Sequence, residues 1–109
     1  MTNADMTDKA AGLRPGVTAS ICALAEKYAV EKVILFGSRA KGSFKRASDI
    51  DLAVSGGDFC AFVLDVDEKT PTLLQYDFVN LDTDVSPALL EEILRDGKII
   101  YEKAPLRAE

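Results

Sequence analysis

Two aspartates spaced two residues apart, Asp49 and Asp51, follow a glycine–serine turn at Gly37 and Ser38. On an extended strand both carboxylates project from one face, while Ile50 between them points to the opposite face. Two acids held side by side repel each other unless a cation lies between them. Mg²⁺ is usually held by one or two carboxylates together with substrate phosphates. The spacing therefore predicts a magnesium–nucleotide site.

The turn itself has the features of an anion-binding loop. Gly37 has no Cβ, so the backbone can bend tightly there, and the N–H groups that follow can face an anion. Arg39 and Lys41 add positive charge next to the turn, and Lys45 and Arg46 follow. The whole chain, however, carries a formal charge of −5. Binding to nucleic acid in general requires dense positive charge, so we expect a polyphosphate ligand and no direct nucleic-acid binding.

Strands must hold this turn on both sides, and the sequence predicts them at 33–36 and 49–54. Further segments follow from apolar spacing and from capping residues such as Asp58 and the pair Ser86-Pro87. We expect helices over 16–29, 58–69 and 87–96, a short helical turn at 38–41, and strands over 75–81 and 98–101. This order predicts an α/β (α+β) fold, a small mixed β-sheet flanked by helices.

The 109 residues are enough for one compact domain. Residues 1–15 show no apolar periodicity and are predicted to form a flexible N-terminal tail, with a single domain over 16–103 and a C-terminal tail over 104–109. The apolar runs are too short to span a membrane, and the N-terminus does not resemble a secretion signal, so we expect a cytoplasmic protein without a membrane partner. Cys22 and Cys60 are predicted to be buried free thiols. The chain has no histidine, which excludes histidine-based zinc sites and nucleophile systems.

The turn and the aspartate pair, taken together, resemble the signature of the polymerase-beta-like nucleotidyltransferase superfamily, in which a Gly-Ser turn precedes an Asp-x-Asp strand. The resemblance covers about residues 17–102. The size of the chain and its ending over 89–102 resemble the minimal nucleotidyltransferase (MNT) branch of this superfamily. Those short proteins are encoded beside HEPN-domain partners, many of them in toxin–antitoxin pairs.

The resemblance implies a role for each site residue. Gly37 and Ser38 would contact the triphosphate of ATP, with Arg39 and Lys41 assisting. Asp49 and Asp51 would bind two Mg²⁺ ions. Lys41 stands where arginine is frequent in the family, and it keeps the charge but loses the bidentate fork of a guanidinium.

A third carboxylate on a later strand is also implied, and Asp77 matches its setting. On a strand, Asp77 shares a face with Val79 and Leu81, which is an unusual place for an acid. A catalytic or metal-binding role would explain that position. The alternative is an acid paired with a nearby lysine or arginine. Asp82 and Asp84 follow the strand in a turn-like sequence and are interpreted as loop residues.

The function implied is that of a nucleotidyltransferase that moves AMP from Mg-ATP to a hydroxyl acceptor. The acceptor suggested by the resemblance is a tyrosine of a HEPN toxin partner, so that the chain acts as the antitoxin. An alternative is a non-catalytic antitoxin or regulatory subunit that neutralises the HEPN partner by contact alone. A third possibility, transfer to a small molecule such as an aminoglycoside, is disfavoured because little chain remains outside the catalytic unit to bind it.

Overall fold

The structure, a computed structural model, describes residues 4–103. Four strands of this region form one sheet in the order β3-β2-β1-β4. The strands are β1 (Lys32–Phe36), β2 (Ile50–Ser55), β3 (Tyr76–Asn80) and β4 (Lys98–Glu102). β1 runs antiparallel to β2 and to β4, whereas β2 and β3 are parallel. The predicted mixed sheet is thereby confirmed.

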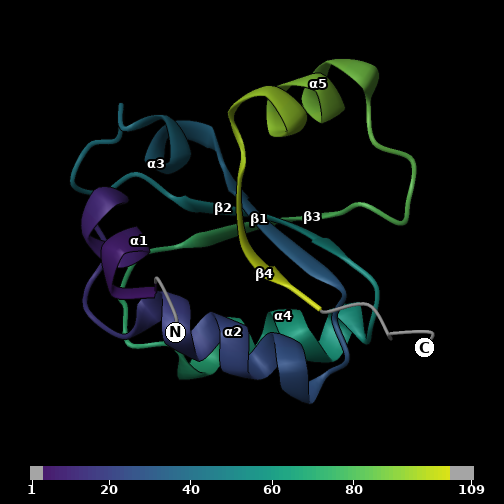
Figure 1. The fold of residues 1–109 in the computed structure, drawn as a ribbon, viewed down its shortest axis with the longest axis horizontal. Helices are drawn as coiled ribbons and strands as arrows, with labels where there is room; N and C mark the ends of the chain where they lie inside the picture. The colour runs from purple at the N-terminus through teal and green to yellow at the C-terminus, as the bar shows by residue number, and fades with distance from the viewer. Residues whose placement is uncertain (1–3, 104–109) are drawn as a thin grey trace, which may run out of the picture.

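Helices cover both faces of the sheet (Figure 1). α2 (Val17–Lys27) and α4 (Phe59–Lys69) lie on one face, and α3 (Gly37–Lys41) and α5 (Pro87–Asp96) lie on the other. Alternating side chains of β1 divide accordingly. Val33 and Leu35 pack in the larger core with α2 and α4, while Ile34 and Phe36 pack with Ile93 of α5. Since successive side chains of a strand point to opposite faces, the apolar run over 33–36 in β1 is what a sheet covered on both sides requires.

The predicted helix caps are present. The Asp58 carboxylate accepts a hydrogen bond from the N–H of Ala61 at 3.2 Å at the start of α4. The Ser86 hydroxyl accepts one from the N–H of Leu89 at 3.2 Å, directly before Pro87 begins α5. Each side chain satisfies an N–H that the first helical turn leaves without a partner. These local signals place the starts of two helices correctly.

The prediction of a flexible tail over residues 1–15 is wrong for residues 4–15. α1 (Ala4–Ala10) is helical, and Ala11 after it is buried. Asp8 is 2% exposed, and its carboxylate accepts hydrogen bonds from the N–H groups of Gly16 at 3.0 Å and Thr18 at 2.8 Å. It therefore caps α2 from a separate helix. Residues 1–3 and 104–109, the remainder of the two predicted tails, lie outside the described residues.

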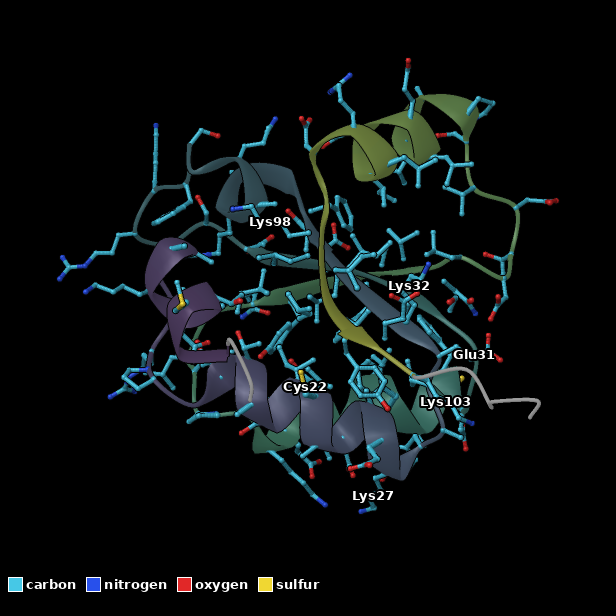
Figure 2. All side chains as sticks on the ribbon, in the orientation of Figure 1. Cys22, Lys27, Glu31, Lys32, Lys98 and Lys103 are labelled. Carbon is cyan, nitrogen blue, oxygen red and sulfur yellow. The ribbon has the colours of Figure 1, made fainter. Side chains whose placement is uncertain are left out.

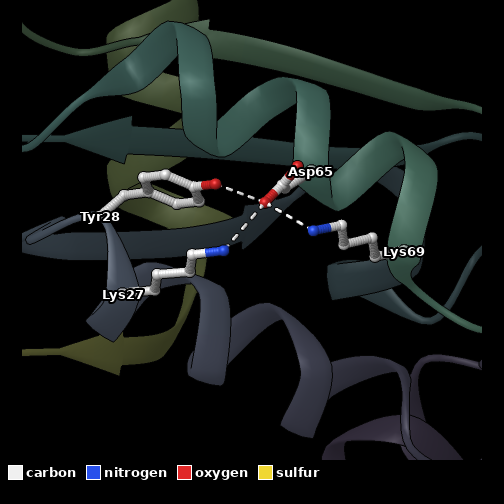
Figure 3. A network of polar contacts seen from close by, with 4 residues as sticks. All are labelled: Lys27, Tyr28, Asp65 and Lys69. Carbon is white, nitrogen blue, oxygen red and sulfur yellow. Dashed lines mark hydrogen bonds and ion pairs between the residues drawn. The ribbon is translucent and has the colours of Figure 1, made fainter.

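Helices α2 and α4 are joined at their surface by polar contacts centred on Asp65 (Figure 3). The Tyr28 hydroxyl donates a hydrogen bond to the Asp65 carboxylate, and Lys27 and Lys69 lie 3.6 and 3.3 Å from the same oxygen. The hydrogen bond from Tyr28 is the largest of the effects that lower the pKa of Asp65. The contacts fix the end of α2 against α4 beneath the sheet.

The two cysteines are free thiols, as predicted, but only Cys22 is partly buried. Its Sγ lies 3.2 Å from the carbonyl oxygen of Ile100, so that α2 contacts β4, and Figure 2 shows the side chain between these two elements. Cys60 lies exposed on α4, because it falls on the side of the helix away from the buried Phe62 and Val66. None of the helices within residues 4–103 is long and apolar enough to cross a membrane.

Candidate active site

The turn between β1 and α3 lies directly against Asp51. Phe36, the last residue of β1, is the register partner of Asp51 on β2. Gly37 follows with a φ of 73°, in the left-handed region that favours glycine. A Cβ at this position would overlap Oδ2 of Asp51. Glycine is therefore needed here for two reasons, the backbone angle and the close approach of the carboxylate.

Asp51 and Asp77 lie side by side in the sheet. They are register partners on the parallel strands β2 and β3, so both project from the same face. That face is the one covered by α3 and α5, since Ala53, two residues after Asp51, packs against Ile93. Asp49 precedes the first residue of β2 and is exposed, as is Asp77, whereas Asp51 is partly buried. The sheet register thus joins two carboxylates that are far apart in the sequence.

The carboxylates act on one another electrostatically. Burial, and then repulsion by Asp77, Asp49 and Glu92, raises the pKa of Asp51 from 3.8 to about 6. Glu92 is a residue that the sequence interpretation missed. It lies on α5 between Leu89 and Ile93, whose side chains pack against the sheet. The sequence does show a polar residue beside the apolar stripe of this helix, and this pattern could have indicated Glu92.

The donor chemistry fits a hard cation. Carboxylate oxygens are the ligands that Mg²⁺ prefers, and a bound cation would offset the repulsion that raises the pKa of Asp51. Even so, no three acidic or cysteine side chains in the part of the chain that the structure describes form a ready-made metal cluster. The register brings Asp51 and Asp77 together, and Asp49 directly precedes the first residue of β2. Substrate phosphates would have to complete the coordination of any ion held there.

Arg39 and Lys41, the two basic residues predicted for the site, have different surroundings. Lys41 is exposed at the end of α3. Arg39 is 1% exposed, and its guanidinium donates to backbone carbonyl oxygens of both the segment after α1 and the loop after α3. The structure therefore places Arg39 in the framework of the loop and not among exposed phosphate-binding side chains. Ser38 is partly buried, and its carbonyl oxygen accepts hydrogen bonds that end the helical turn at Gly42 and Ser43.

Residues 20–106 match the family model described as polymerase beta, nucleotidyltransferase. The chain belongs to this nucleotidyltransferase family. The match includes the glycine turn, the aspartate pair and Asp77. The family suggested by the sequence motif is thereby confirmed.

Relatives of this nucleotidyltransferase include a curated protein named "Putative protein adenylyltransferase MJ0604" from Methanocaldococcus jannaschii. The two are 30% identical over 90 residues, which span 72% of this chain and 88% of the relative. Solved structures with a similar fold include a mutant of the MntA-HpeT toxin–antitoxin, with a TM-score of 0.62 and 23% identity over 79% of this chain and 73% of that one. Another is a toxin–antitoxin with AMP-PNP, with a TM-score of 0.58 and 25% identity over the same shares. The fold and the nucleotidyltransferase activity predicted from the sequence agree with these relatives.

Proposed function

We propose that this nucleotidyltransferase transfers AMP from Mg-ATP to a hydroxyl group of a partner protein. The observation that carries the proposal is the register pairing of Asp51 and Asp77 directly beside the Gly37 turn. The name of the archaeal relative supports protein adenylylation, and the AMP-PNP in a toxin–antitoxin of the same fold supports ATP as the nucleotide. The acceptor we propose is a tyrosine of a HEPN toxin, with this chain as its antitoxin.

Each residue of the proposed site would have its own role in the reaction. Asp49 and Asp51 would hold two Mg²⁺ ions, and Gly37, Ser38 and Lys41 would bind the triphosphate. Asp77 would hold a metal ion or accept the proton of the attacking hydroxyl. The acceptor oxygen forms a bond to the α-phosphorus of ATP as the bond to pyrophosphate breaks, and the hydroxyl proton passes to the base. Divalent ions at such a site neutralise the phosphates and stabilise charge on the entering and leaving oxygens.

The test combines the purified chain, Mg-ATP and the candidate toxin, followed by intact mass spectrometry of the toxin. We expect an AMP-sized mass increase with wild type and none with Asp49→Asn or Asp77→Asn. Asp84→Asn is a matched control, because this exposed acid lies in the loop after β3, outside the proposed site. It should leave the transfer unchanged. Absence of any mass increase with wild type would refute the enzymatic proposal.

The same variants distinguish enzymatic from purely binding action on the toxin. If modification silences the toxin, Asp49→Asn/Asp51→Asn should bind the toxin but fail to inhibit it. Equal inhibition by wild type and the double variant would show that contact alone is sufficient. Pull-down of the toxin by each variant provides the control for binding.

A further inference from the structure

The guanidinium of Arg39 joins two segments that are distant in the sequence. Nη1 donates to the carbonyl oxygens of Ala11 at 2.8 Å and Gly12 at 3.2 Å, in the segment that follows α1. Nε donates to the carbonyl oxygen of Ser48 at 3.0 Å, and Nη2 lies 3.4 and 3.2 Å from those of Lys45 and Arg46. One planar group therefore connects the N-terminal segment with the basic loop.

The loop side of this contact leads directly to the proposed active site. The carbonyl of Ser48 belongs to the peptide bond whose nitrogen is that of Asp49, so the hydrogen bond from Arg39 fixes the peptide plane immediately before this aspartate. The loop is also closed internally, because the Ser48 hydroxyl accepts from the N–H of Lys45 at 2.7 Å. Arg39 thus binds one compact turn, and not three carbonyl groups that could move independently of one another.

Phe44, from the loop that follows α3, packs against both Arg39 and Gly12. The Phe44 ring lies over the Arg39 guanidinium, with 4.9 Å from Cζ of the arginine to the ring centroid. A Cβ on Gly12 would overlap the Phe44 ring and would lie 3.1 Å from Nη1 of Arg39. Gly12, Arg39 and Phe44 therefore form a junction in which an added methyl group would have to displace the Phe44 ring. Figure 1 shows α1 beside α3 and the loop that follows it.

The N-terminal side lies before the matched nucleotidyltransferase region, which begins at residue 20. α1 and the residues after it are thus an element outside the matched region that reaches the catalytic loop through Arg39. Burial of a charged guanidinium is unfavourable unless its donors are satisfied, and here backbone carbonyls from both segments satisfy them. If either segment moves, the guanidinium loses a large part of its acceptors.

We propose that Arg39 is a positioning residue, which uses the segment after α1 as an anchor to hold the 45–48 loop and the Asp49 backbone in the arrangement that binds Mg-ATP. Its effect on nucleotide binding rests on the proposed function. Its effect on the order of the loop does not. α1 is then part of the catalytic unit, although it precedes the matched region.

Two readouts separate these effects. Hydrogen exchange of the amides of residues 45–49 reports the order of the loop without requiring activity. Calorimetric titration with Mg-ATP reports the nucleotide affinity. In Arg39→Met we expect the amides of 45–49 to lose their protection against hydrogen exchange. We also expect roughly 10- to 100-fold weaker Mg-ATP binding, the range typical when residues that hold metal ligands in place are replaced. Arg39→Lys, which retains charge but not the fork, should restore part of both properties.

Gly12→Ala tests the same junction if Arg39→Met fails to fold. The added methyl group must displace the Phe44 ring, so protection at 45–49 should fall while α4 and β3 stay protected. Gly56→Ala is the matched control. Its φ of 77° gives it similar backbone strain, but it follows β2, away from the junction, and its added Cβ would meet only the side chain of the exposed Glu31. It should leave the loop unchanged.

Unchanged exchange at 45–49 in Gly12→Ala and in Arg39→Met, or in Gly12→Ala and Arg39→Lys where Arg39→Met does not fold, would overturn the proposal. Lost protection together with unchanged Mg-ATP affinity would also overturn it, because the loop would then be ordered without positioning the site. A wild-type chain that binds no Mg-ATP would instead count against the proposed function. The exchange result would still decide whether Arg39 holds the loop.

Discussion

Replacing Asp51 by asparagine should make the metal-free protein more stable while it abolishes the proposed AMP transfer. Burial and the neighbouring acids raise the pKa of Asp51 from 3.8 to about 6. The folded state therefore holds the proton more tightly than the unfolded state does. Stability consequently falls as pH rises from the unfolded-state pKa to the folded-state pKa, and above about pH 6 the penalty is constant.

The magnitude follows from the same two values. A pKa that moves from 3.8 to about 6 corresponds to about 3 kcal/mol of unfolding free energy above the higher pKa. The Asp51 side chain is only partly buried, so solvent screening reduces the expected penalty to about 1–2 kcal/mol. The asparagine introduced by the substitution carries no charge at any pH. The variant should therefore exceed wild type by that amount near pH 7 and match it where the carboxyl is protonated in both states.

Urea denaturation in the presence of EDTA, repeated at several pH values between about 3.5 and 7.5, measures this difference. Glu68→Gln is the control, because it removes one exposed acid from α4 and gives the same change in net charge. An Asp51→Asn protein no more stable than wild type near pH 7 would refute the electrostatic account of the site. A gain in stability that did not vary with pH would refute it as well.

Four further substitutions, one of them a comparison, test the framework. Gly37→Ala should destabilise the fold by about 2 kcal/mol or more in thermal denaturation, because it combines a positive φ with overlap of the site carboxylate. Gly42→Ala, with a φ of 82° and no atom within 4 Å, should cost only about 1 kcal/mol. Equal losses would contradict the close approach at residue 37. Asp8→Ala should cost about 1–2 kcal/mol in urea denaturation by removing the cap of α2, and no loss would show that this cap is replaced by water. Tyr28→Phe should raise the pKa of Asp65 toward its ordinary value in an NMR titration, since the hydrogen bond from the Tyr28 hydroxyl is the largest effect that lowers this pKa. An unchanged pKa would contradict the network in Figure 3.

The sequence predicted most elements because their signals are local. The aspartate spacing, the apolar run of β1 and the capping residues of α4 and α5 act over a few neighbouring residues, and the structure agrees with each. The predicted start of β2, at Asp49, differs from the observed start by only one residue. The α1 segment was missed because the partners of Asp8 are eight and ten residues away, so its charge resembled that of a solvated tail.

Side-chain roles were less predictable than elements. Arg39 follows the glycine–serine turn, where exposed positive charge would suit a phosphate, yet its acceptors come from residues 11–12 and 45–48. Glu92 acts on Asp51 from α5, an effect that depends on how this helix lies over the sheet. Neither arrangement has a signature in the spacing of nearby residues.

The sequence by itself determined the local chemistry of this protein: a glycine where the backbone must bend, two acids at a spacing of two, and strands and helices in a fixed order. Those features follow from backbone geometry and from the direction of side chains within single elements. Only the tertiary structure decided which carboxylates meet. The register between β2 and β3 places Asp77 beside Asp51, and packing buries the Arg39 guanidinium among carbonyls from two segments, because both arrangements depend on contacts between residues far apart in the chain.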